Sequence, residues 1–179
     1  MFWISPCYTT PPVGFETPLQ KAAYQALQAL EIPFIRVNTD EAITMEDCVQ
    51  INEKLNMKMV KTLFLCNQQK TDFYLFITVG DKPFCAKAFR NALGAPRVSF
   101  APAQRMEEML GVKTGAATIF SVLLDQENKI RVVLDQEVVH QEWYGCSDGT
   151  TNCYMKLKTA DMIGTFLPFT GHAPAVIEV

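Results

Sequence analysis

The sequence contains few of the residues that commonly bind metal ions. It has only two histidines, His140 and His172, and none of its six cysteines belongs to a C-x-x-C pair. A zinc site therefore has little support, because such sites are built from closely spaced cysteines and histidines. Several cysteines lie inside apolar runs, and we interpret them as reduced, mostly buried thiols of a cytosolic protein.

The sequence also lacks an excess of positive charge and a long hydrophobic run. Its formal net charge of −3 argues against a broad nucleic-acid-binding surface, but not against a small basic patch that grips one end of a nucleic acid. No run of about 18 apolar residues is present, so we expect no membrane span. The start of the chain is apolar but contains prolines and no basic region, which is unlike a signal peptide.

The order of helical and strand patterns predicts a single α/β or α+β domain. The chain of 179 residues is long enough for one sizeable core. We expect residues 1–16 to form an irregular arm, and residues 17–179 to form a mixed sheet flanked by helices. Helical patterns span 18–30, 44–55, 85–94, 101–111 and 159–167, and strand patterns span 33–38, 59–66, 72–79, 96–100, 115–125, 129–135, 153–157 and 174–179. Residues 136–152 show neither pattern and are predicted to be irregular.

A lysine interrupts one of the predicted strands. The stretch MVKTLFLC at 59–66 is mostly apolar but contains Lys61. Because strand residues alternate between two faces, Lys61 shares a face with Leu63 and Leu65. Such a lysine commonly lies near a strand end and extends its charge to water. The alternative is a lysine held at the floor of a cleft to meet an anionic or carbonyl oxygen, and periodicity alone does not choose between the two.

An ordered set of sequence blocks bears on that choice. Lys61 is followed by LFL, and the blocks LGAPRVSFA, LGVKTG, VLD and TGHAP come after it in that order. Over residues 17–179 the chain resembles the YbaK/ProX family, and most closely its ProX (PrdX) branch of prolyl-tRNA-synthetase-associated editing domains. The resemblance implies a single α/β domain with a mixed, barrel-like sheet flanked by helices. It also implies hydrolysis of the ester between a wrong amino acid and the 3′-terminal adenosine of tRNA.

The resemblance matches Lys61 to the essential lysine of the family. Its ammonium would bind a phosphate or the reacting ester and support the developing oxyanion. A water or the vicinal ribose hydroxyl would complete the hydrolysis. This chemistry needs no metal, cofactor, cysteine nucleophile or Ser-His-Asp set. The best-known substrate of the ProX branch is alanyl-tRNA(Pro), so the implied partners are the acceptor end of an aminoacyl-tRNA and prolyl-tRNA synthetase.

The chain departs from the family pattern beside the expected amino-acid pocket. Thr62 follows Lys61, where the ProX branch often has asparagine. A family loop with the pattern G-x-x-x-P, which lines the pocket, aligns with Gly115, Ala116, Ala117, Thr118 and Ile119. Isoleucine thus replaces the proline, while the glycine and the small residues are kept. We expect backbone N–H groups of this loop to approach a carbonyl or oxyanion, although the loop is also compatible with a plain turn before a strand.

A second departure lies before the strand pattern at 153–157. Relatives carry a His-Pro…Asn-Thr block there, whereas this chain has Ser147, Asp148 and Thr151 at the His, Pro and Asn positions, with Asn152 one residue beyond. We expect Ser147, Thr151 and Asn152 to line the pocket, where their hydroxyl and amide groups would suit a polar side chain better than alanine. The same departures permit a second hypothesis, a non-catalytic relative that binds an aminoacyl-tRNA end, a free aminoacyl ligand or a synthetase.

Other residues have both a structural and a functional interpretation. Trp143 and Tyr144 could stack on the terminal adenine, although such aromatics more often pack in a core or a lid. We interpret His172, in TGHAP, as structural. Five basic residues would form either a local patch or scattered solvated charges: Lys58, Lys82, Lys87, Arg90 and Lys113.

Overall fold

The computed structural model describes residues 1–179, and its strands form two sheets. The strands are β1 (Phe34–Asn38), β2 (Val60–Asn67), β3 (Phe73–Val79), β4 (Val98–Phe100), β5 (Ile130–Asp135), β6 (Trp143–Ser147), β7 (Cys153–Lys158) and β8 (Ala175–Ile177). A mixed five-stranded sheet has the order β4-β2-β3-β5-β8, and an antiparallel three-stranded sheet has the order β1-β7-β6. A single parallel bridge between Met59 and Gly145 joins them. The predicted α/β domain is confirmed, with its strands divided between two sheets.

The helices cover these sheets and include short 3-10 and π-helical segments. They are α1 (Pro18–Ala29), α2 (Met45–Leu55), α3 (Ala86–Leu93), α4 (Ala103–Arg105), η1 (Met106–Leu110), η2 (Ile119–Leu124), α5 (Gln136–Val139), α6 (Thr159–Asp161), η3 (Met162–Phe166) and α7 (Leu167–Thr170). The predicted helix starts are confirmed, because Thr17 caps α1 and a capping box of Thr44 and Asp47 begins α2. None of these helices has both the length and the apolar character that a membrane span needs.

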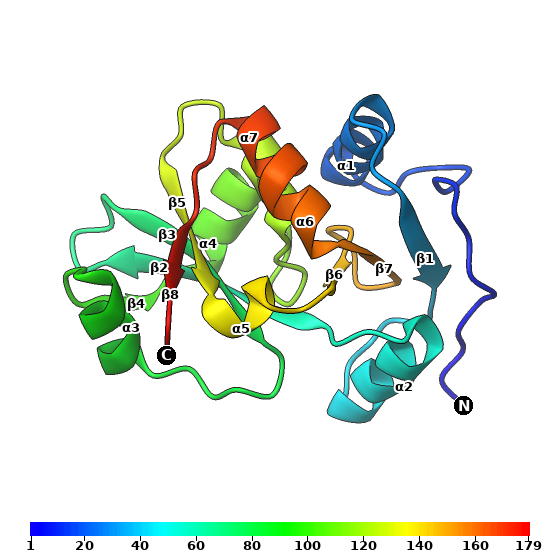
Figure 1. The fold of residues 1–179 in the computed structure, drawn as a ribbon, viewed down its shortest axis with the longest axis horizontal. Coiled ribbons are helices and arrows are strands. Elements are labelled where there is room, and N and C mark those ends of the chain that lie inside the picture. The colour runs from blue at the N-terminus through cyan, green and yellow to red at the C-terminus, as the bar shows by residue number, and fades with distance from the viewer.

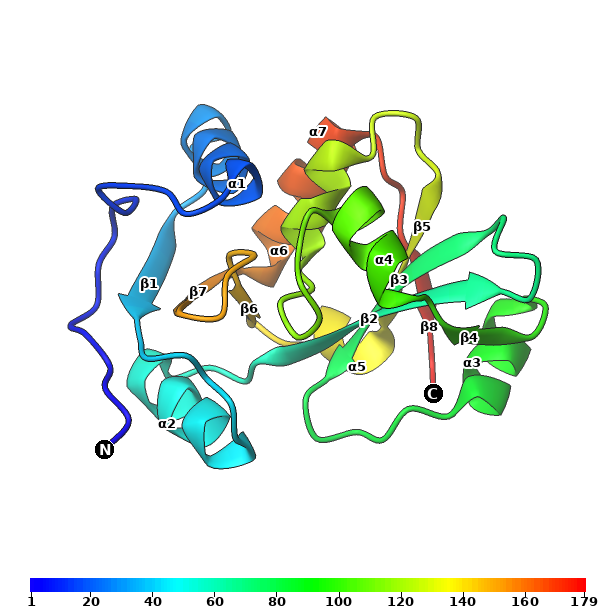
Figure 2. The ribbon, with the colours of Figure 1, turned by 180° about the vertical axis from the view of Figure 1, so that it is seen from behind.

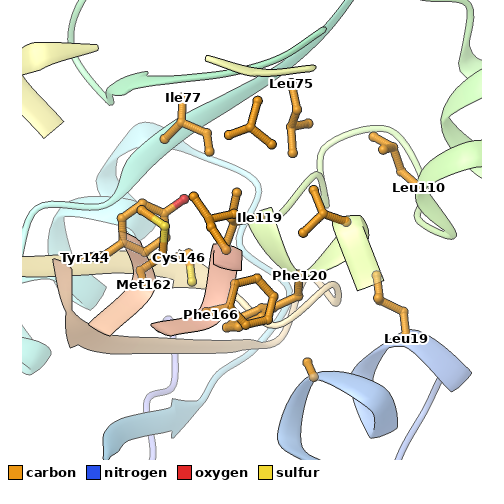
Figure 3. Close-up of a cluster of buried hydrophobic side chains, with 14 of the residues drawn as sticks. Leu19, Leu75, Ile77, Leu110, Ile119, Phe120, Tyr144, Cys146, Met162 and Phe166 are labelled. Atoms are coloured by element: carbon orange, nitrogen blue, oxygen red, sulfur yellow. The ribbon is translucent and has the colours of Figure 1, made fainter. Parts of the chain in front are cut away.

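The five-stranded sheet is covered on both faces. On one face, β2, β3 and β5 pack against α1, η1, η2 and η3 in the main core, part of which is drawn in Figure 3. On the other face, Leu65 and Phe76 pack against Phe89 of α3. The three-stranded sheet and α2 lie together at one side of the molecule, and the start of β2 runs between the two halves (Figures 1 and 2). The start of β2 is thus the place where the two sheets meet.

The strand predicted at 115–125 is wrong. These residues form a loop followed by the 3-10 helix η2, which Thr118 caps by accepting the N–H of Phe120. The residues from Ile119 to Val122 are buried, and a short apolar run of this kind does not distinguish a core strand from a buried helix. The strand β5 therefore has no hairpin partner before it and instead pairs in parallel with β3 and β8.

Residues 136–152, predicted to be irregular, contain one helix and one strand. Asp135 caps α5, because its carboxylate accepts the N–H of Glu137 at 3.0 Å. The strand β6 pairs with β7 over its whole length, from Trp143 to Ser147. Because this region contains glycine and polar residues, its sequence did not indicate β6. The partner strand, β7, begins only a few residues later.

Residues 1–16 form an extended arm along the outer edge of β1 (Figure 1). The Ser5 N–H donates to the Asn38 carbonyl at 2.9 Å, and Tyr8 and Arg36 exchange two main-chain hydrogen bonds of 2.8 Å. The arm is mostly irregular, but these bonds tie it to the three-stranded sheet.

Candidate active site

Lys61 is the second residue of β2 and lies opposite Thr78 of β3. Its side chain is partly buried, and Nζ donates a hydrogen bond to the main-chain oxygen of Lys82. Its ammonium forms no ion pair with a carboxylate. Because an ammonium has three N–H donors, Lys61 keeps donors and an uncompensated charge for an added anion.

Lys82 lies beside Lys61, but its ammonium forms ion pairs with carboxylates. Its Nζ lies 2.8 Å from Asp135 and 3.1 Å from Glu137. Thr78 Oγ1 donates to the same Asp135 carboxylate at 2.6 Å. Burial opposes the ionisation of Asp135, but hydrogen bonds from Lys82, Thr78 and the Glu137 N–H outweigh it and hold the pKa of Asp135 below its ordinary value. This network supports Lys61, because Thr78 is its cross-strand neighbour and Lys82 accepts its hydrogen bond.

The loop before η2 has two unpaired backbone donors. Gly115 is exposed and has a φ of +93°, which favours glycine. The N–H of the buried Ala116 donates to the Lys113 carbonyl at 3.0 Å. The next two N–H groups, of Ala117 and Thr118, make no hydrogen bond within the protein. Two adjacent free N–H groups could hold a carbonyl or an oxyanion.

Thr118 fixes this loop to the end of β6. Its buried Oγ1 donates to the Ser147 carbonyl at 2.8 Å. The structure thus brings together two of the residues predicted to line the amino-acid pocket. Ser147 presents its carbonyl to this contact, while its own Oγ accepts the N–H of Gly149 at 3.4 Å.

The start of β2 separates Lys61 from this loop. Lys61 shares a sheet face with Thr78, whereas Thr62 lies opposite Ile77 on the other face. Ile77 belongs to the main core together with Ala116 and Ile119, and Figure 3 shows Ile77 and Ile119 in that core beside the Tyr144 ring. Lys61 and the loop therefore lie on opposite faces of β2 in this structure.

The residue after Ser147 is a buried acid. Asp148 is fully buried and accepts hydrogen bonds from Gln20 Nε2 at 2.9 Å, from Tyr24 Oη at 2.8 Å and from Thr150 Oγ1 at 2.7 Å. Burial, followed by the charge of Asp148, raises the pKa of Tyr24 well above its ordinary value. We call Asp148, Gln20, Tyr24 and Thr150 the Asp148 cluster. Its hydrogen bonds join the end of β6 to α1 and stabilise the fold.

The remaining predicted pocket residues face the N-terminal side of the molecule. Thr151 Oγ1 donates to Glu41 at 3.3 Å, and Asn152 Nδ2 donates to Glu16 at 2.8 Å. Asn152 lines a pocket of about 660 Å³, which lies between the arm and β1 and does not include Lys61. Thr151 and Asn152 are thus not gathered around Lys61 in this structure.

The aromatic and histidine candidates pack within the fold. Tyr144 is fully buried, so its ring is not available to stack on an adenine. Lys156 and Lys158 place their ammonium groups 4.4 and 4.3 Å from the centre of the Trp143 ring. His172 is buried, and its Nε2 lies 2.8 Å from Asp125, which confirms its structural interpretation.

The buried thiols are poor nucleophiles. All six cysteines are free. Burial and the nearby charge of Asp148 raise the pKa of Cys153 to about 12, and burial raises that of Cys146 further. Because the thiolate is the reactive form, neither thiol is activated for attack on an ester.

The comparison with protein families decides the identity of the domain. A family model described as "Aminoacyl-tRNA editing domain" matches residues 39–165. The chain belongs to this family. The match includes Lys61, the loop at 115–118 and the segment from Ser147 to Asn152.

Named relatives of this editing domain refer to prolyl-tRNA. A Danio rerio protein named Prolyl-tRNA synthetase associated domain-containing protein 1 is 27% identical over 162 residues, covering 89% of this chain and 87% of the relative. Prolyl-tRNA editing protein ProX from Acetoanaerobium sticklandii is 28% identical over 120 residues, covering 67% of this chain and 73% of the relative. A solved structure described as a candidate trans-editing enzyme for prolyl tRNA synthetase aligns with a TM-score of 0.63 at 15% identity. The alignment covers 92% of this chain and 99% of the solved one. The last similarity shows the shared fold.

The structure also explains one departure of this editing domain from the family pattern. Ile119, which stands at the position of the family proline, is the first residue of η2. Proline is favoured at the first position of a helix, so isoleucine keeps a turn that proline would also fit. Ile119 is fully buried and fills the core there. Asp135 belongs to the VLD block that resembles the family, but the sequence pattern alone predicts no role for it.

Proposed function

We propose that this editing domain hydrolyses the ester of a mischarged aminoacyl-tRNA, with Lys61 as the catalytic residue. The observation that carries the proposal is the contrast between two lysines in one corner. Lys82 is neutralised by Asp135 and Glu137, whereas Lys61 forms no ion pair. An ammonium that has no counter-charge beside a paired one is available to an anionic ligand.

In the proposed reaction a water oxygen attacks the ester carbonyl carbon. The carbonyl oxygen becomes an oxyanion, which the Lys61 ammonium stabilises. The ester bond to the ribose then breaks, and the ribose oxygen receives the proton that the attacking water loses, directly or through the vicinal hydroxyl. The free N–H groups of Ala117 and Thr118 would hold the amino-acid part of the substrate. For both groups to act on one ester, the Lys61 side chain must leave the Lys82 carbonyl and extend past the start of β2.

The proposed substrate is tRNA(Pro) carrying alanine or a similarly small amino acid. The names of the relatives support the choice of tRNA, because one is a prolyl-tRNA editing protein. The proposed partners are the acceptor end of the tRNA and prolyl-tRNA synthetase, which would deliver the mischarged product. Both the substrate and the free cysteines suit the cytosol.

A second candidate function is a non-catalytic module that binds an aminoacyl-tRNA end. The observation that favours it is the position of Lys61 and of the 115–118 loop on opposite faces of β2. In such a module the mischarged ester would be bound and remain intact.

A deacylation assay separates the two functions. The test follows the loss of amino acid from tRNA(Pro) charged with alanine, cysteine, serine or proline, using wild type and Lys61→Ala. The proposal predicts rapid hydrolysis of one mischarged species, sparing of prolyl-tRNA(Pro), and a loss of about a hundredfold or more in rate in Lys61→Ala.

Lys21→Ala is the matched control, because Lys21 is an exposed lysine of α1 that is remote in sequence from β2. It should hydrolyse the substrate at the wild-type rate. If no charged tRNA(Pro) is hydrolysed while mischarged tRNA(Pro) still binds, the enzyme is ruled out and the binding module is supported.

A further inference from the structure

A pocket beside the N-terminal arm is separate from the candidate active site. It has a volume of about 660 Å³ and lies between the N-terminal arm and the edge formed by β1 and the start of β7. Trp3 and Tyr8 of the arm line one side, and Arg36, Asn38 and Asn152 line the other. Main-chain hydrogen bonds from the arm to β1 hold this pocket in shape.

Arg36 places an unpaired positive charge in this pocket. The residue is only 4% exposed, and its guanidinium forms no ion pair. Nε donates to the Thr10 carbonyl at 2.6 Å, and Nη1 donates to Asn38 Oδ1 at 2.9 Å. Nη2 makes no hydrogen bond in the protein, yet it is not among the buried unsatisfied atoms, so it reaches the solvent of the pocket. A buried guanidinium with free N–H groups is a strong site for a phosphate.

The neighbours of Arg36 are suited to an aromatic ligand with polar edges. The guanidinium carbon lies 4.9 Å from the centre of the Tyr8 ring, which holds it in place. Trp3 is 52% exposed, so much of its ring is free to stack. Glu16 is the one carboxylate of the pocket, and it is exposed and accepts from Asn152 at 2.8 Å. Its other oxygen and the amides of the pocket match the hydroxyl and amine groups of a nucleotide.

We propose that the arm pocket binds a nucleotide, with its phosphate on Arg36 and its base on Trp3. Stacking of a base on an aromatic ring and a charge-assisted hydrogen bond to phosphate are the usual components of such sites. The nucleotide is either free or part of the single-stranded end of an RNA. The site does not involve Lys61, and it stands whether or not the domain hydrolyses aminoacyl-tRNA.

Calorimetric titration tests this site without any activity measurement. The probes are AMP, inorganic phosphate, adenosine and the trinucleotide CCA, added to the full chain. AMP should bind more tightly than either phosphate or adenosine, and phosphate should compete with it. Arg36→Gln should weaken AMP binding about tenfold or more, and Trp3→Ala should weaken it severalfold. A complex with CCA that is tighter than the complex with AMP and is weakened by Arg36→Gln assigns the site to RNA, and a tighter complex with AMP assigns it to a free nucleotide.

Arg131→Gln is the matched control, because Arg131 is an exposed arginine on a strand of the other sheet. It should bind AMP as wild type does. If Arg36→Gln does not fold, Arg36→Lys and Trp3→Ala still test the site, because Trp3 is outside the core. Absence of AMP binding at millimolar concentration, equal affinity for AMP and phosphate, or unchanged affinity in both remaining variants would overturn the proposal.

Discussion

Lys61 and the Asp148 cluster place charged side chains inside the same fold in two different ways. Asp148 is fully buried, and Gln20, Tyr24 and Thr150 supply its hydrogen bonds. Lys61 is partly buried, and a single main-chain oxygen accepts its hydrogen bond. The acid is thus satisfied by the protein, whereas the ammonium is not.

This difference separates stability from function. A buried charge that has all its partners holds elements together, and removing it leaves those partners unsatisfied. A charge that lacks a partner contributes little to folding and is available to a ligand. The comparison therefore predicts large stability effects at the Asp148 cluster and small ones at Lys61.

The largest effect on stability is expected for Asp148→Ala. The change leaves buried hydrogen-bond donors of Gln20 and Tyr24 without an acceptor, which should cost about 3 kcal/mol of unfolding free energy. Urea denaturation measures the loss. Asp81→Ala, at an exposed aspartate in the loop after β3, should change stability by less than about 0.5 kcal/mol. Equal stability of the two variants would mean that the cluster is not a structural element.

The second-largest effect on stability is expected for Asp135→Asn, and this effect depends on pH. Because the folded state lowers the pKa of Asp135, its ionisation stabilises the fold above the ordinary aspartate pKa of about 3.9, and this contribution is lost as pH falls through the folded value. Wild type should exceed the variant by about 2 kcal/mol at neutral pH. The difference should shrink in acid, as urea denaturation at several pH values would show. A difference that stays constant into strong acid would contradict this origin.

A smaller effect is expected for Thr118→Val. This change removes the hydrogen bond from Oγ1 to the Ser147 carbonyl and should cost about 1 kcal/mol. Thr114→Val, in the same loop but exposed, is the matched control and should leave the thermal midpoint nearly unchanged. If the two variants melt together, Thr118 does not anchor the loop to β6.

The smallest effect on stability is expected for Lys61→Ala. The ammonium forms no ion pair, so its loss should change the unfolding free energy by less than about 0.5 kcal/mol. Urea denaturation beside wild type checks this. A loss similar to that of Asp148→Ala would place Lys61 among the structural charges and end the distinction between the two regions.

Sequence patterns predicted the helices and strands that have local signals, such as the caps at Thr17 and Thr44. They failed where burial decides the structure, as for the apolar run from Ile119, which forms a 3-10 helix. Lys61 was found from the family blocks. The positions of Thr151 beside Glu41 and of Asn152 beside the arm were not predicted, because they depend on how β7 pairs with β1 and with β6.

The most direct test of the account is the single-turnover rate of alanyl-tRNA(Pro) hydrolysis, measured for wild type and Lys61→Ala alongside their unfolding free energies. The account predicts a rate about a hundredfold or more lower in the variant, with stability unchanged within about 0.5 kcal/mol. Hydrolysis at the wild-type rate by a folded Lys61→Ala protein would contradict it, because the unpaired ammonium would then have no part in the reaction.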